Sequence, residues 1–169
     1  MASDVVIGST TDANDGNTIS GNGSDGISIS ENFDSVEIYA NKIGVNTSGS
    51  AAIPNTGAGL RILSSANQVG VSGNAPAGNV ISGNSGIGVM LIGVAAGGNS
   101  LFGNMIGTNT AGASLGNGST GIYVNQGAFA TTIGNITGGG NTIAFNAANG
   151  INVADGQTVN IRGNSIYSN

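Results

Sequence analysis

The sequence predicts an all-β solenoid, in which the chain winds through short strands that stack coil upon coil. The segment 16–22, Gly-Asn-Thr-Ile-Ser-Gly-Asn, returns in related form at 78–84 and 140–146, so the period is 62 residues both times. Within the short segments, apolar residues alternate with small or polar ones, which is the pattern of a half-buried strand. Self-similarity at a fixed period is typical of a solenoid.

Six windows of the form Asn-x-Ile-x-x-Asn organise the chain. Their first residues are separated by 24, 38, 25, 37 and 23 residues, so two alternating kinds of coil make up one repeat. We expect the isoleucines to form one inward core stack and the leading asparagines to form a corner ladder of hydrogen-bonded amides. The isoleucines are Ile19, Ile43, Ile81, Ile106, Ile143 and Ile166, and the asparagines are Asn17, Asn41, Asn79, Asn104, Asn141 and Asn164.

Two further motifs complete each coil. The motif Gly-apolar-x-apolar begins at residues 26, 59, 86, 121 and 150, and a third segment matches between 36–41, 99–104 and 159–164. Each coil therefore contains three short strands, and like strands should stack in parallel about 4.8 Å apart. Glycine and asparagine are expected to supply the positive φ angles of the corners. The outward position of the glycine motif holds Ser28, Arg61, Gly88, Tyr123 and Asn152.

Two segments lengthen alternate coils. Residues 47–58 and 110–120 align with each other, and both contain a short Gly- and Ser- or Ala-rich stretch followed by an apolar residue and an asparagine. Loops of this kind project from one edge of a solenoid, where specific contacts are commonly made.

Composition excludes several classes of function. Three basic residues stand against eight acidic ones, for a net charge of −5, and this balance argues against nucleic-acid binding. Cysteine and histidine are absent, which excludes disulfides, thiolate metal sites and a Ser-His-Asp arrangement. No apolar run approaches the roughly 18 residues of a membrane span, so none is expected.

The segments Asn-x-Ile-Gly-Thr-Asn, Leu-Gly-Asn and Gly-Ile-x-Val resemble the right-handed parallel β-helix repeats of large bacterial secreted and cell-surface proteins. That superfamily includes pectate lyases, other polysaccharide-active enzymes and phage tailspikes. The resemblance implies one right-handed parallel β-helix of about five coils with two alternating coil types. We expect residues 1–169 to be a single domain, cut from a longer array at the cell surface or outside the cell. Its uncapped ends suggest end-to-end self-association.

Resemblance to pectate lyases would also imply clustered carboxylates that hold calcium and an arginine that acts as a base. Seven of the eight acidic residues precede residue 38, however, and none occupies the outward position of the glycine motif. The segment 12–17 could offer oxygen ligands to calcium, but it lacks a downstream bidentate glutamate and is better explained as a turn. We therefore assign no catalytic residue, cofactor or metal ligand. A polysaccharide lyase or glycoside hydrolase remains the alternative.

Aromatic and arginine side chains give the candidates for ligand contact. Tyr39, Phe102 and Arg162 occupy equivalent positions two coils apart, and Arg61 and Tyr123 do so on another face. Sugar rings stack on aromatic side chains, and arginine binds carboxylates, so polysaccharide is the partner that fits these residues. The sequence favours a non-catalytic structural or adhesive segment that contacts glycans.

Overall fold

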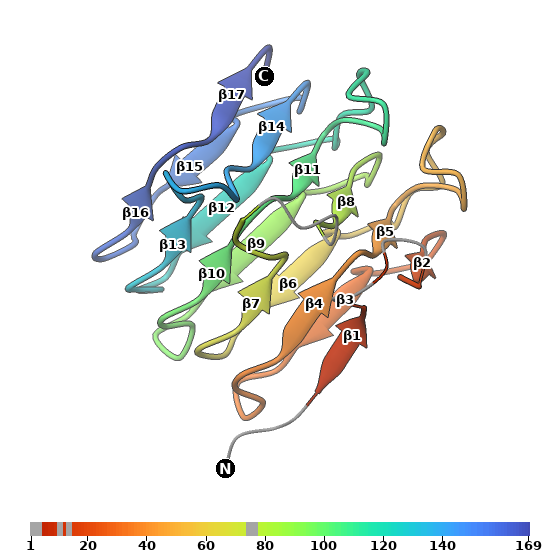
Figure 1. Ribbon diagram of the computed structural model, residues 1–169. Helices are drawn as coiled ribbons and strands as arrows, with labels where there is room; N and C mark the ends of the chain where they lie inside the picture. Colours follow the sequence, from red (N-terminus) through yellow and green to blue (C-terminus); the bar gives the residue numbers. More distant parts are fainter. Residues whose placement is uncertain (1–4, 10–11, 13–14, 74–77) are drawn as a thin grey trace.

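The computed structural model describes residues 5–9, 12, 15–73 and 78–169. Its regular structure consists of short parallel strands in three sheets, which we name A, B and C (Figure 1). The chain visits the sheets in the order A, B, C and then begins the next coil. This part of the chain holds no helix with the length and apolar character needed to cross a membrane.

Sheet A faces the viewer in Figure 1 and continues from the first coil to the last. Its six strands pair in the order β1-β4-β7-β10-β13-β16. They are β1 (Val6–Gly8), β4 (Glu37–Tyr39), β7 (Gln68–Val69), β10 (Ser100–Leu101), β13 (Thr132–Ile133) and β16 (Asn160–Ile161).

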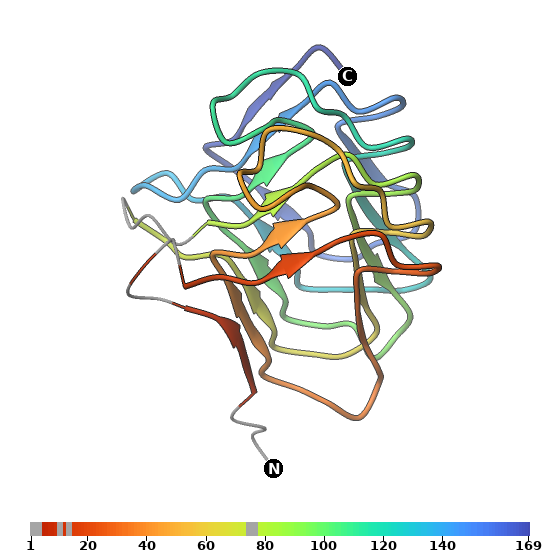
Figure 2. The same ribbon diagram turned by 90° about the vertical axis from the view of Figure 1, so that its right-hand side faces the viewer.

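Sheets B and C form the other two walls, as the turned view in Figure 2 shows. Sheet B contains β2 (Thr18–Ile19), β5 (Lys42–Ile43), β8 (Val80–Ile81), β11 (Met105–Ile106), β14 (Thr142–Ala144) and β17 (Ser165–Tyr167). Sheet C contains β3 (Ile27–Ile29), β6 (Leu60–Ile62), β9 (Val89–Ile92), β12 (Ile122–Asn125) and β15 (Ile151–Val153). Five coils of three strands are thus followed by β16 and β17, which confirms the right-handed parallel β-helix.

The window isoleucines lie in one register column on sheet B. The middle four, from Ile43 to Ile143, are fully buried in a single core with apolar residues of sheets A and C. Ile19 is half-buried and Ile166 is 46% exposed, because they belong to the first and last coils. Each coil covers the apolar face of its neighbours, so the outermost stacked residues are covered from one side only.

The asparagine ladder is confirmed. From Asn17 to Asn141, each side-chain Nδ2 donates to Oδ1 of the ladder asparagine in the next coil, at 2.9–3.1 Å, and Asn164 is the last acceptor. The Oδ1 atom also accepts the backbone N–H of the preceding ladder residue. Buried amides therefore have partners along the whole stack, as buried polar groups require.

A second ladder follows the corner between sheets B and C. It joins Asn22, Asn55, Asn84, Asn117, Asn146 and Asn169 through Nδ2–Oδ1 bonds of 2.8–2.9 Å. In the two long coils, the last asparagine of the window does not enter this ladder. Asn46 and Asn109 instead accept backbone N–H groups of their own loops, and the ladder resumes at Asn55 and Asn117. Each loop is therefore inserted between the last asparagine of the window and the asparagine that joins the ladder.

The register of sheet C differs from the expectation at one strand. Arg61 and Tyr123 both pair with Met90, so Met90 rather than Gly88 occupies the outward position of the third coil. Gly88 belongs to a column of glycines that precede these strands, at residues 26, 59, 88, 121 and 150. A Cβ atom on Gly88 would lie 2.5 Å from Gly121 O and 2.9 Å from Ile106 Cγ2, which explains why glycine is needed there.

The conformation of the corners also differs from the expectation. Many glycines have positive φ, but no asparagine does in the described ranges. The left-handed residue instead precedes the ladder position, as with Ala40 before Asn41 and Phe145 before Asn146. The asparagine side chain can point into the corner because the residue before it makes the bend.

Candidate functional site

On the outer face of sheet A, one position alternates from coil to coil between glycine and a large side chain. In odd coils, Gly8 ends β1, and Gly70 and Gly134 directly follow β7 and β13. In even coils, the same place is taken by Tyr39, Phe102 and Arg162. The glycines have φ between 75° and 100°, and a Cβ atom on each would meet the backbone of the next coil at 2.2 Å or less. The glycines therefore leave gaps between the large side chains.

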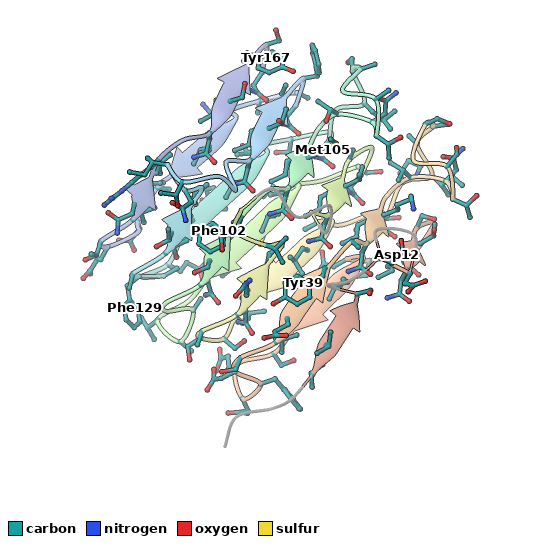
Figure 3. All side chains as sticks on the ribbon, in the orientation of Figure 1. Asp12, Tyr39, Phe102, Met105, Phe129 and Tyr167 are labelled. Carbon is teal, nitrogen blue, oxygen red and sulfur yellow. The ribbon has the colours of Figure 1, made fainter. Side chains whose placement is uncertain are left out.

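Tyr39 occupies the outward position of β4 but is covered by neighbouring residues. Only 3% of it is exposed, and it packs with Ala40 and Val71. Burial, with a smaller effect from the Glu37 carboxylate and its hydrogen bond, raises the pKa of Tyr39 to about 12. Its ring cannot stack on a ligand, which corrects the expectation that Tyr39 is available for ligand contact; Figure 3 shows it on the same sheet as Phe102.

Phe102 and Arg162 border a hollow of about 270 Å³ above Gly134. Thr132 and Asn160, on the outward positions of β13 and β16, belong to its lining, as does Ile136, which is 74% exposed. Arg162 Nη2 donates to Asn160 Oδ1 at 3.2 Å. The lining thus combines an aromatic ring, a guanidinium, amides and a hydroxyl.

The charge around this hollow is unusual for an acidic protein. Between residues 62 and 154 the sequence contains no Asp, Glu, Lys or Arg. Strand β4, which carries Glu37, lies four strands away from β16, or about 19 Å at normal strand spacing. That separation exceeds the Debye length of about 8 Å, so the carboxylates of the first two coils are screened from Arg162. Asp155, in the turn before β16, is the nearest acidic residue in the sequence.

Arg61 and Tyr123 lie on sheet C and do not belong to the hollow. Arg61 Nε is 2.8 Å from Asp25 Oδ2, so this guanidinium is held in an ion pair. The Tyr123 hydroxyl accepts from Asn125 Nδ2 at 2.5 Å. Met90 on β9 lies between them, because it pairs with Arg61 on β6 and with Tyr123 on β12. The sequence candidates therefore occupy two faces rather than one site.

Neither the protein-family models, nor the curated proteins, nor the solved structures with which the chain was compared gave a significant match.

Two carboxylates that sequence reasoning left unassigned connect the first coil to the second. Asp25 Oδ1 accepts the Ala58 N–H at 2.7 Å, in addition to the Arg61 ion pair. Asp34 Oδ1 accepts both the N–H and the hydroxyl of Ser65 at 2.8 Å, and these bonds lower the pKa of Asp34. Both sets of bonds cross about 30 residues of sequence, so no local pattern identifies them.

The candidate calcium segment 12–17 lies only partly in the described structure, because residues 13 and 14 are outside it. Asp15 N donates to Asp12 O at 3.2 Å, which is a turn bond. Among the described residues, no group of three Asp, Glu, His or Cys side chains is placed to hold a metal ion.

The long loops of the second and fourth coils extend from the edge between sheets B and C (Figure 1). They touch each other although 62 residues separate them: Thr110 Oγ1 donates to Ser48 O at 3.3 Å. Thr110 N also donates to Gly49 O at 3.2 Å. The two insertions therefore form one layer that spans the intervening short coil.

Proposed function

We propose that this chain is a non-catalytic structural segment of a bacterial cell-surface or secreted protein, related in fold to the pectate-lyase-like superfamily. Its role is to act as a stiff spacer that displays loops and contacts glycans. The observation that carries this proposal is the unbroken register: strands pair coil by coil in all three sheets, and two asparagine ladders run beside them. Stability in such a stack is a sum of neighbour contacts, so length can grow without loss of order.

The glycan contact is proposed at the hollow between Phe102 and Arg162. A sugar ring has an apolar face that fits an aromatic ring and hydroxyl groups that fit amides such as Asn160. A carboxylated sugar would add a charge-assisted pair with Arg162, which has no ion-pair partner among the described residues.

A screen against neutral and acidic polysaccharides, with and without calcium, tests both parts of the proposal. Retention and release of shortened chains are recorded together. We expect retention of acidic chains without release. Release of oligosaccharides would overturn the non-catalytic role and favour a lyase or hydrolase.

Variants locate the contact. Arg162→Gln should weaken retention of acidic chains, and Phe102→Leu should weaken retention of acidic and neutral chains. Lys42→Gln is the matched control, because it removes the same charge from sheet B, away from the hollow. Equal effects of Arg162→Gln and Lys42→Gln would show that only net charge matters and would exclude the hollow as the site.

A further inference from the structure

Three Asn-Gly pairs occur in this chain in three different environments: Asn22-Gly23, Asn117-Gly118 and Asn149-Gly150. Asparagine followed by glycine is prone to spontaneous deamidation, because glycine lacks a Cβ atom that would hinder approach of its nitrogen to the asparagine side chain. The reaction needs both groups to be free to move. The three pairs therefore allow one chain to test how the ladder affects this chemistry.

Asn117 is held at every polar atom of its side chain. Its Oδ1 accepts from Asn84 N at 3.1 Å and from Asn84 Nδ2 at 2.9 Å. Its Nδ2 donates to Ile81 O at 3.0 Å and to Asn146 Oδ1 at 2.8 Å. The backbone nitrogen of Gly118, which would have to approach the Asn117 side chain, is held as well, because it donates to Asn84 O at 2.8 Å. Asn117 is also only 1% exposed, so its reaction requires local unfolding.

Asn22 is an intermediate case. Its side chain is exposed, and Nδ2 makes a single bond to Asn55 Oδ1 at 2.8 Å. A Cβ atom on Gly23 would meet nothing within 4 Å, so the neighbouring backbone is open to movement. One hydrogen bond must break before the amide can turn toward the Gly23 nitrogen.

Asn149 is the least restrained of the three. It is exposed, and no hydrogen bond found in the described part of the chain uses its side-chain amide or the N–H of Gly150. It lies outside both asparagine ladders, in the short turn between β14 and β15. We infer that Asn149 is a site of spontaneous deamidation, and that the ladder protects the chemically identical pair at Asn117.

The reaction balances without any partner except water. The Gly150 backbone nitrogen attacks Cγ of Asn149, and the amide nitrogen leaves as ammonia. The cyclic succinimide that results takes up water to give aspartate or isoaspartate. Each event adds one negative charge to a chain of net charge −5.

Isoaspartate at residue 149 would disturb the fifth coil. The Asn149 carbonyl accepts from Gly121 N, and the Gly150 carbonyl accepts from Ile122 N, both at 2.9 Å. In isoaspartate the main chain runs through Cβ and Cγ of residue 149, so the backbone gains one methylene and the former Asn149 carbonyl becomes a free carboxylate. Both inter-coil bonds cannot then keep their spacing, so β15 should loosen from β12.

Peptide mapping by mass spectrometry after incubation at mildly alkaline pH tests the inference. In the folded chain, we expect the rates to fall in the order Asn149, Asn22, Asn117, with Asn117 slower than Asn149 by on the order of 100-fold or more. In denaturant, the three rates should converge, because the local sequences are alike. Asn149→Gln, which keeps an amide but lengthens the side chain, should abolish the change at residue 149.

Two results would overturn the inference. One is a rate at Asn117 equal to that at Asn149 in the folded chain; the other is an order of rates that persists after denaturation. Hydrogen exchange checks the consequence, since the amides of Gly121 and Ile122 should lose protection in the deamidated fraction only. The outcome does not depend on whether the protein binds or cleaves a glycan.

Discussion

Replacement of Asn104 by alanine gives the sharpest test of the ladder. Asn104 is 1% exposed, and its side chain makes four hydrogen bonds. It accepts from Asn79 N at 3.1 Å and Asn79 Nδ2 at 2.9 Å, and it donates to Val69 O and Asn141 Oδ1 at 2.9 Å. At about 1 kcal/mol net for each bond, Asn104→Ala should reduce the free energy of unfolding by about 4 kcal/mol.

Asn17→Ala is the matched control, because it makes the same change at the exposed start of the same ladder. Within the described residues, the substitution removes one side-chain bond, from Asn17 Nδ2 to Asn41 Oδ1, so the cost should be about 1 kcal/mol or less. Urea unfolding followed by circular dichroism measures both variants. The expected difference of about 3 kcal/mol is a large part of the 5–15 kcal/mol typical of a domain. Equal unfolding midpoints for the two variants would refute the structural role of the ladder.

Three further predictions concern packing and charge. Gly88→Ala should destabilise the protein by about 2 kcal/mol, because its Cβ atom would lie 2.5 Å from a backbone oxygen. Gly23→Ala is the control, since a Cβ atom there would lie in open space, and it should cost less than about 1 kcal/mol. Thermal melts compare the two variants. Ile81→Asp should abolish folding, since Ile81 is fully buried, and a cooperative β-rich melt would contradict its place in the core. The hydrogen bonds from Ser65 lower the pKa of Asp34 in the folded state, so their stabilisation is present above the unfolded pKa of about 3.9 and is lost as pH falls through the folded value. Unfolding of Asp34→Asn across this acidic range should depend less steeply on pH than unfolding of the parent; an unchanged slope would exclude the contribution of Asp34.

The sheet C register shows where a repeating pattern becomes ambiguous. The segment around residues 86–91 fits Gly-apolar-x-apolar in two registers that differ by two residues, and a shift of two keeps the same residues facing inward. Pairing of Met90 with Arg61 and Tyr123 selects one of them. The signal was present in the spacing of the glycines, which is 33, 29, 33 and 29 residues in the observed register.

The burial of Tyr39 and the contacts of the carboxylates depend on contacts that a local pattern does not encode. Alternation places Tyr39 and Phe102 in equivalent positions, but Tyr39 is buried and packs with Val71 and Ala40. Likewise, Asp25 and Asp34 have turn-like local sequences, and their partners belong to the next coil.

The sequence alone determined the repeat, the three strands of each coil, the isoleucine column and the first asparagine ladder. These features follow from short-range alternation and from a fixed period, because each coil contacts only its neighbours. The tertiary structure alone decided which asparagines continue the second ladder past the loops, which aromatic ring is buried, and which residues border the hollow above Gly134. Each of these depends on how a side chain or loop of one coil packs against the next, and that contact has no counterpart within a single repeat.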